Sequence, residues 1–87
     1  MKIKKGFVVR KIAGEDVVVA LGAASKQFNG LIKLNDTGRF LWDKLSVGCD
    51  EGELVEAVAS EYDVDKETAA RDIKVFVDTL KGAGVLE

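Results

Sequence analysis

The chain contains no histidine and no proline, and its only cysteine is Cys49. A single cysteine excludes an internal disulfide, and without histidine the usual nitrogen and thiolate ligand sets for zinc are missing. A Ser-His or Cys-His nucleophile pair is excluded for the same reason. Asp50 and Glu51 follow Cys49 directly and disfavour its thiolate. We therefore expect no metal, no cofactor and no catalytic activity.

Long hydrophobic runs are also absent. No apolar run approaches the ~20 residues that a membrane-spanning helix needs, and the basic start at residues 1–5 is not followed by the apolar core of a signal peptide. The chain has 87 residues, of which 47% are hydrophobic and 32% charged, which is enough for one small core. We expect one globular domain over residues 1–87, located in the cytoplasm and without contact to a membrane.

Charge is unevenly distributed along the chain, although the net charge is only −2. Residues 1–34 contain seven Lys or Arg and two acids, whereas residues 50–67 contain eight acids and only Lys66 as a base. This pattern is typical of solvated faces of opposite sign. The alternative is a surface that guides a charged partner.

The first third of the chain has the composition of β-strands. Residues 7–13 and 16–21 are rich in β-branched side chains, and Gly14-Glu15 between them predicts a tight hairpin turn. Residues 22–27 lack periodicity and are expected to be a connection. Residues 28–34 resume an extended, mostly apolar run, which predicts a third strand.

The remainder predicts three helices, each preceded by a capping residue. Asn35 caps a helix over about 36–47, and Asp50 with Glu53 forms a capping box for a second helix that ends near Tyr62. Asp65 caps a third helix over about 66–83. The residues expected to face the core are Leu41, Trp42, Leu45, Leu54, Val55, Val58, Ala59, Tyr62, Ala69, Ile73, Phe76, Val77 and Leu80. The fold class is therefore α+β, in the order β-β-β-α-α-α.

The end of the chain is expected to close this core. Gly84 is placed to adopt a left-handed conformation after the third helix, which turns Val85 back toward Leu80.

Two helices joined by a short turn beside a small sheet are typical of a winged-helix DNA-binding protein. A DNA reader needs clustered Lys and Arg to neutralise phosphates, but residues 50–67 are acidic. We therefore expect no nucleic acid partner. Glu53 and Glu56 are paired carboxylates on an exposed helix face with no predicted cleft, a position that favours solubility over acid-base chemistry.

Several segments, taken in order and with their spacing, resemble the PqqD family. They are residues 34–45, 53–58 and 61–65, then Asp72-Ile73 through Phe76-Val77 and Leu80, and finally Gly84-Val85-Leu86. The resemblance implies a winged-helix-like domain that acts as a peptide chaperone or RiPP recognition element. Such domains bind the leader segment of a ribosomally made precursor peptide and present it to a modifying enzyme, often a radical SAM protein.

The resemblance also implies where the leader binds. In the family the leader adds as an extra strand to the third strand, in the groove between that strand and the third helix, which is β-augmentation. The matching residues of the third strand are Leu31, Ile32 and Lys33. On the third helix, the stripe outside the core is expected to border this groove, and it consists of Arg71, Lys74, Val75 and Asp78. The flank with Ala70, Val77 and Lys81 is an equally reasonable wall of the groove, and the sequence does not distinguish between the two.

The partners follow from the same resemblance. The expected partners are a precursor leader peptide and a modifying enzyme, and the acidic second helix with Glu53 and Glu56 is a hypothetical enzyme contact. Nothing in the sequence identifies the pyrroloquinoline quinone pathway. The alternatives are a winged-helix DNA-binding protein and a dimerisation module that uses the same free strand edge. The chain is expected to be a monomer or a weak homodimer.

Overall fold

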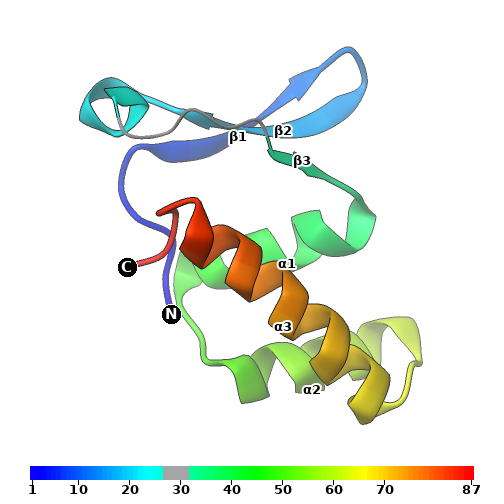
Figure 1. The fold of residues 1–87 in the computed structure, drawn as a ribbon. Helices are drawn as coiled ribbons and strands as arrows, with labels where there is room; N and C mark the ends of the chain where they lie inside the picture. Colours follow the sequence, from blue (N-terminus) through cyan, green and yellow to red (C-terminus); the bar gives the residue numbers. More distant parts are fainter. Residues whose placement is uncertain (27–31) are drawn as a thin grey trace.

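A computed structural model describes residues 1–26 and 32–87 of the chain. A three-stranded sheet lies on one side of the molecule and three α-helices lie on the other (Figure 1). This arrangement confirms the predicted α+β fold with the order β-β-β-α-α-α. The elements are β1 (Phe7–Ile12), β2 (Glu15–Ala20), the 3-10 helix η1 (Gly22–Lys26), β3 (Ile32–Leu34), α1 (Asp36–Val47), α2 (Glu51–Tyr62) and α3 (Lys66–Gly82).

The hairpin turn lies one residue earlier than predicted. Ile12 pairs with Glu15, so the two turn residues are Ala13 and Gly14 rather than Gly14 and Glu15. Ala13 has φ 52° and Gly14 has φ 81°. Positive φ at both central residues is the type I′ geometry, which matches the right-handed twist of the flanking strands. Glu15 therefore joins β2 and leaves the turn.

The sheet is antiparallel with the order β1-β2-β3. The described part of β3 is Ile32–Leu34, and residues 28–31 of the predicted third strand lie outside the described residues. The segment after β2, predicted to be an aperiodic connection, forms the short helix η1 instead. Its turn is supported by a 2.7 Å hydrogen bond from the hydroxyl of Ser25 to the carbonyl of Gly22.

All three predicted helix caps are confirmed. The Asn35 side chain accepts a 2.8 Å hydrogen bond from the backbone of Gly38, and the Asp65 side chain accepts one of the same length from a backbone N–H three residues on. Asp50 and Glu53 form the predicted capping box at the start of α2, with reciprocal hydrogen bonds of 2.8 and 3.1 Å. Because each cap satisfies an otherwise unpaired amide, it defines where its helix begins. Helix α3 ends at residue 82, one residue before the predicted end.

The two ends of the chain pair with each other beneath the sheet (Figure 1). Gly84 has φ 74°, and the Val85 amide donates to the carbonyl of Leu80 over 3.0 Å. Val85 is fully buried, as predicted. The chain then runs beside the N-terminal segment, where an isolated β-bridge joins Ile3 to Leu86. The C-terminal residues are therefore an integral part of the core.

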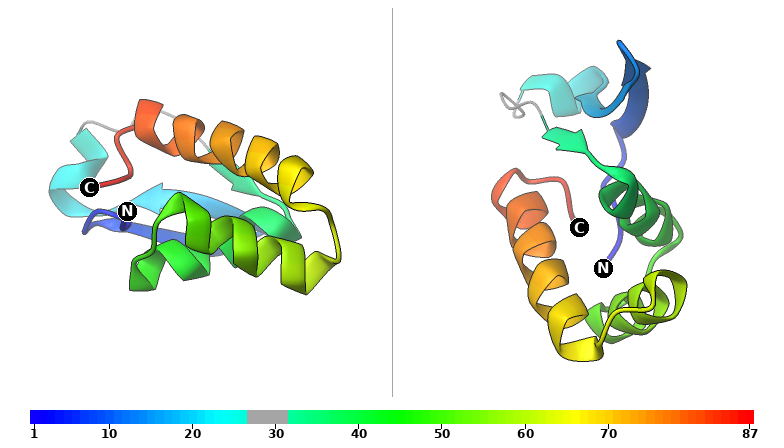
Figure 2. Two further views of the ribbon diagram at one scale, coloured as in Figure 1. Left: turned by 90° about the horizontal axis from the view of Figure 1, so that it is seen from below. Right: turned by 90° about the vertical axis from the view of Figure 1, so that its right-hand side faces the viewer.

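The core lies between the inner face of the sheet and the three helices (Figure 2). Its members share low exposure and come from every α-helix, from β2 and β3, and from the C-terminus: Val18, Leu34, Leu41, Trp42, Leu45, Leu54, Val58, Ala69, Ile73, Val77, Leu80, Val85 and Leu86. Four predicted core residues lie outside the buried core: Val55 and Ala59, which are half-buried, and two aromatic residues. Tyr62 is 39% exposed because α2 ends at this residue, and Phe76 is half-buried. Both aromatic rings therefore reach the surface.

Candidate functional site

Strand β3 lies at the edge of the sheet. It pairs with β2 through the register Asp16↔Leu34, Val17↔Lys33 and Val18↔Ile32. Within residues 1–26 and 32–87 no other strand pairs with its second edge. Side chains alternate along a strand, so Ile32 and Leu34 face the helices whereas Lys33 faces the other way. The second edge of β3 presents backbone donors and acceptors to a further strand.

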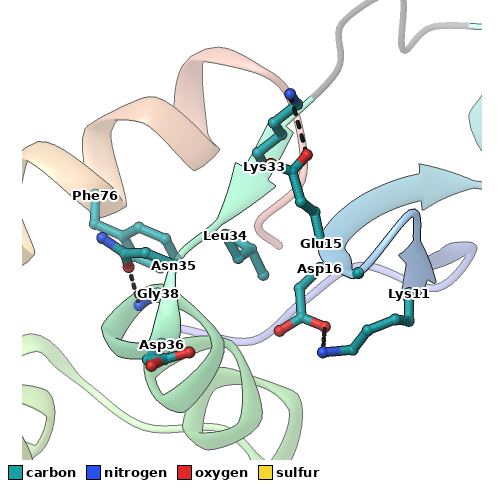
Figure 3. A pocket seen from close by; sticks show the side chains of 10 residues that line it. Lys11, Glu15, Asp16, Lys33, Leu34, Asn35, Asp36, Gly38 and Phe76 are labelled. Atoms are coloured by element: carbon teal, nitrogen blue, oxygen red, sulfur yellow. Dashed lines mark hydrogen bonds and ion pairs between the residues drawn. The ribbon is translucent and has the colours of Figure 1, made fainter.

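A hollow of about 490 Å³ lies where β3 passes into α1. In Figure 3, Phe76 of α3 points toward Asn35 and Gly38 across this hollow. A second hollow of about 240 Å³ adjoins the first and shares Asn35, Gly38 and Phe76 with it, while Asp72 is its further contribution from α3. Together the two hollows form a depression at the β3–α1 junction, with the end of the β1–β2 hairpin on one side and α3 on the other. We call it the β3–α3 groove.

Gly38 forms the floor of this groove. A Cβ atom at this position would lie 3.2 Å from the side-chain oxygen of Asn35, 3.4 Å from a ring carbon of Phe76 and 3.5 Å from a methyl carbon of Leu34. The first two distances are tighter than ordinary van der Waals contact. The absence of a side chain at Gly38 therefore allows the Asn35 cap, the Phe76 ring and Leu34 to approach one another.

The charged groups on the hairpin and β3 side of the groove are paired, whereas Asp36 and Asp72, which also line it, form no ion pair within residues 1–26 and 32–87. Lys33 lies 3.1 Å from Glu15, and Asp16 lies 3.4 Å from Lys11 and 3.5 Å from Arg39 of α1. The Asp16 side chain is only 13% exposed, so these two ion pairs hold a largely covered carboxylate. The Arg39 pair connects the hairpin to α1 on the sheet side of the groove, whereas the Lys11 pair joins β1 to β2.

The predicted site residues occupy different places. Ile32 and Lys33 lie in β3, as predicted, and Leu31 lies outside the described residues. All members of the predicted α3 stripe are exposed: Arg71, Lys74, Val75 and Asp78. Lys74 and Asp78 pair with each other at 3.2 Å.

The alternative wall of α3 has a buried member. Val77 is fully buried in the core, whereas Ala70 and Lys81 on the same flank are exposed. A buried Val77 contacts the rest of the core and is not available to a ligand.

Sequence analysis missed the two α3 residues that line the groove. Phe76 was assigned to the core and Asp72 was not singled out, yet both line the hollows. Their spacing of four residues places them on one stripe at the margin of the core face. An aromatic residue at the edge of an apolar arc is the signal that identifies such a position.

The described residues carry little chemistry beyond binding. No group of three potential metal ligands occurs within residues 1–26 and 32–87. Burial, followed by the nearby carboxylate of Glu53, raises the pKa of the Cys49 thiol and disfavours its nucleophilic form. In these same ranges no helix is sufficiently long and apolar to cross a membrane. The groove offers backbone groups, an aromatic ring and charged side chains, which suit recognition.

Fold and groove together define a small, winged-helix-like α+β domain with an open edge strand beside a lined depression. Residues 9–86 match the family described as coenzyme PQQ synthesis protein D, PqqD. This match spans most of the chain, and the protein therefore belongs to the PqqD family, as the sequence predicted.

Two solved structures are similar over nearly their whole length. The structure "TbiB1 in Complex with the TbiA(beta) Leader Peptide" has a TM-score of 0.78 and 31% sequence identity, with 100% of this chain and 95% of that chain covered. The structure "Lasso peptide synthetase B1 complexed with the leader peptide" has a TM-score of 0.73 and 25% identity, with 97% and 93% covered. Among curated proteins, none matches the sequence significantly. Both structural neighbours are complexes with a leader peptide.

Proposed function

We propose that this protein captures the leader segment of a ribosomally synthesised precursor peptide. The leader adds as a strand to the open edge of β3 and lies in the β3–α3 groove. The protein performs no chemistry of its own and presents the bound leader to a modifying enzyme, for which family resemblance implies the radical SAM type. The leader-peptide complexes formed by both structural neighbours support this proposal.

The observation that carries the proposal is the position of the open β3 edge directly beside the hollow. Backbone groups on this edge bind any extended chain, because main-chain hydrogen bonds do not depend on side-chain identity. Alternate side chains of an added strand point to the same side. One set therefore points into the hollow that Phe76 and Asp72 line. Selectivity for the leader sequence arises from these inward-facing leader side chains.

The residues in contact with the leader follow from this placement. Leu31, Ile32 and Lys33 supply the strand edge, and Phe76 and Asp72 line the groove opposite. Val75 lies three residues beyond Asp72 and is 65% exposed, which places it on the outer rim of the α3 wall.

The rest of the predicted α3 stripe has a smaller role. Arg71 precedes Val75 by one turn on the same outer rim. Lys74 and Asp78 are already paired with each other, so we assign them peripheral contacts with the leader.

An NMR titration with a synthetic leader peptide tests this function. We expect amide shifts at residues 32–34, Asp72 and Phe76, with the α2 amides unchanged. A scrambled peptide of the same composition is the control, and it should produce much smaller shifts. Shifts confined to α2, with residues 32–34 silent, would contradict strand addition.

Two alternatives make different predictions in solution. A DNA-binding protein would bind a duplex with an affinity that falls steeply as salt rises, and we expect no duplex binding even at low salt. A dimerisation module using the β3 edge would associate in a concentration-dependent manner without peptide. Analytical ultracentrifugation of the free protein separates this outcome from leader capture.

A further inference from the structure

A second surface lies between α1 and α2, which run side by side in Figure 2. Phe40, Lys44 and Val47 occupy positions i, i+4 and i+7 of α1 and therefore share one stripe. The Phe40 ring packs against Tyr62 of α2, with ring centroids 5.5 Å apart and planes at 87°. Lys44 and Val47 line a hollow of about 320 Å³ together with Gly48, Cys49, Glu53 and Ala57. We call this surface the α1–α2 seam.

The seam exposes two large apolar side chains, Val47 and Tyr62. Val47 is 83% exposed, the largest exposure among the large hydrophobic side chains of residues 1–26 and 32–87, and Tyr62 is 39% exposed. The Lys44 ammonium lies 5.1 Å from the centre of the Phe40 ring, so its aliphatic stem runs between these two ends. Single exposed apolar residues are ordinary, but a highly exposed valine that lines a hollow, on the same helix stripe as a partly exposed aromatic pair, is typical of an interaction surface.

The charge around the seam has one dominant sign. Helix α2 contains four glutamates and neither Lys nor Arg: Glu51, Glu53, Glu56 and Glu61. Lys66 neutralises Glu56 at 2.8 Å, and Glu53 also accepts a hydrogen bond from the Asp50 backbone. Lys44 is the basic residue among those that line the hollow. A partner that covers the seam therefore contacts exposed apolar side chains and an acidic helix, of whose four glutamates Glu53 lines the hollow.

We propose that the α1–α2 seam is the docking surface for the modifying enzyme, and that the enzyme contributes an apolar side chain flanked by Lys or Arg. This inference rests on the proposed function, because the enzyme is the partner implied there. Charge complementarity selects such a surface, since opposite potentials steer encounter and fix orientation. A second copy of this chain fits poorly, because a symmetric contact would place one acidic helix against another.

The location of the seam permits both partners to bind at once. The groove is lined by Asn35 and Gly38 at the start of α1 and by Phe76 of α3. The seam uses the Phe40, Lys44 and Val47 stripe, which faces α2 instead. An enzyme on the seam therefore leaves the β3 edge free for the leader.

Substitution of the most exposed seam residue tests the proposal. The probe is the purified modifying enzyme encoded beside the precursor peptide, titrated against the full chain by biolayer interferometry. Val47→Lys should weaken enzyme binding by about tenfold or more, because it places a cation where the partner is basic. Affinity for the leader should remain unchanged. The matched control is Leu21→Lys, which places the same charge at a residue that is 46% exposed outside both surfaces.

A second pair of substitutions tests the charge. Replacing Glu51 and Glu61 by Gln should reduce the salt dependence of enzyme binding, because long-range attraction between exposed charges is screened by salt. Both residues are exposed and lie outside the capping box, so thermal unfolding should remain close to wild type.

The outcomes separate this inference from the proposed function. Equal enzyme affinity of wild type and Val47→Lys overturns the seam, as does self-association of the free protein that Val47→Lys abolishes. A wild-type chain that binds the leader and fails to bind the enzyme also overturns the seam, while leader capture stands. A chain that binds the enzyme through Val47 and ignores the leader overturns the proposed function alone.

Discussion

The β3–α3 groove and the α1–α2 seam offer different kinds of interaction. The groove presents backbone groups of an edge strand, and two ion pairs, Lys33 with Glu15 and Asp16 with Lys11, lie on its rim. The seam lies between two helices whose backbone groups bond internally, so only side chains are available there. Of the four α2 glutamates, only Glu56 forms an ion pair within residues 1–26 and 32–87. From this difference we expect an extended peptide to be bound through its backbone and a folded partner to be recognised through charge and shape.

The largest expected effect comes from the leader backbone. N-methylation removes one N–H donor from a peptide residue, and only alternate residues of an added strand direct that donor to β3. Loss of such a bond with an acceptor left unpaired costs about 1–3 kcal/mol. We expect affinity to fall by roughly five- to 150-fold at every second position and little between them. Isothermal titration calorimetry along a methylated peptide series measures this pattern.

Enzyme binding provides the control for this series. Methylated leaders should leave the affinity of the free protein for the enzyme unchanged, because the seam contributes no backbone donors. A loss of leader affinity that does not alternate from one methylated position to the next would indicate recognition through side chains. The groove and the seam would then not differ in how they bind a partner.

A smaller effect is expected from replacing one aromatic residue in each surface by leucine. Phe76→Leu keeps an apolar side chain at the core margin but removes the ring that lines the groove. Leader affinity should fall about tenfold, in the range of interface residues that matter. Tyr62→Leu removes the ring packed on Phe40, and it should weaken enzyme binding by a similar factor. Each variant should leave the other ligand unaffected.

Titration of each variant with the leader and with the enzyme measures the four affinities. Circular dichroism melting curves monitor folding, and a melting temperature close to wild type is required before affinities are compared. If Phe76→Leu lowered the affinity for the leader and the affinity for the enzyme equally, the groove and the seam would be coupled through α1 and α3 and would not act independently.

The smallest effect should arise from a helix cap that lies outside both surfaces. Hydrogen bonds from the backbone and then the side chain of Thr68 lower the pKa of the Asp65 carboxyl. A lowered folded-state pKa gives stability that is present above the unfolded value of about 3.9 and is lost as pH falls through the folded value. We expect the melting temperature of wild type to decrease with acid in this range.

The Asp65→Asn variant isolates the cap contribution. Asn retains the capping acceptor but does not titrate, so its melting temperature should decrease less than that of wild type below about pH 4. At neutral pH both affinities should equal those of wild type, because Asp65 is part of neither the groove nor the seam. Identical acid dependence of the two proteins would contradict a role for the Asp65 charge.

Much of the fold was predictable because its signals are local. Asn35, Asp50 and Asp65 each accept a hydrogen bond from the amide three residues further on, and such bonds depend on the neighbouring sequence alone. Gly84 likewise ends α3 through its own left-handed conformation. The resemblance to the PqqD family rested on the order of these same local features, and it was confirmed.

The errors concern features that depend on twist or packing. The hairpin turn is at Ala13-Gly14 because the twist of paired strands requires positive φ at both central residues. Tyr62 has the spacing of a core residue, but the helix ends there and its ring turns to Phe40. Helical periodicity gives an angle around the axis and contains no information on where the neighbouring layer stops.

The sequence by itself determined the element order, the helix caps, the acidic character of α2 and the membership of the PqqD family. Only the tertiary structure decided which α3 residues lie beside the β3–α1 junction: Phe76 and Asp72 line the hollows there, Val77 is buried, and Val75 remains outside. The reason is physical. Caps and charges are properties of residues close in the chain, whereas a groove exists only where β3, α1 and α3, distant in sequence, are brought together by a shared core.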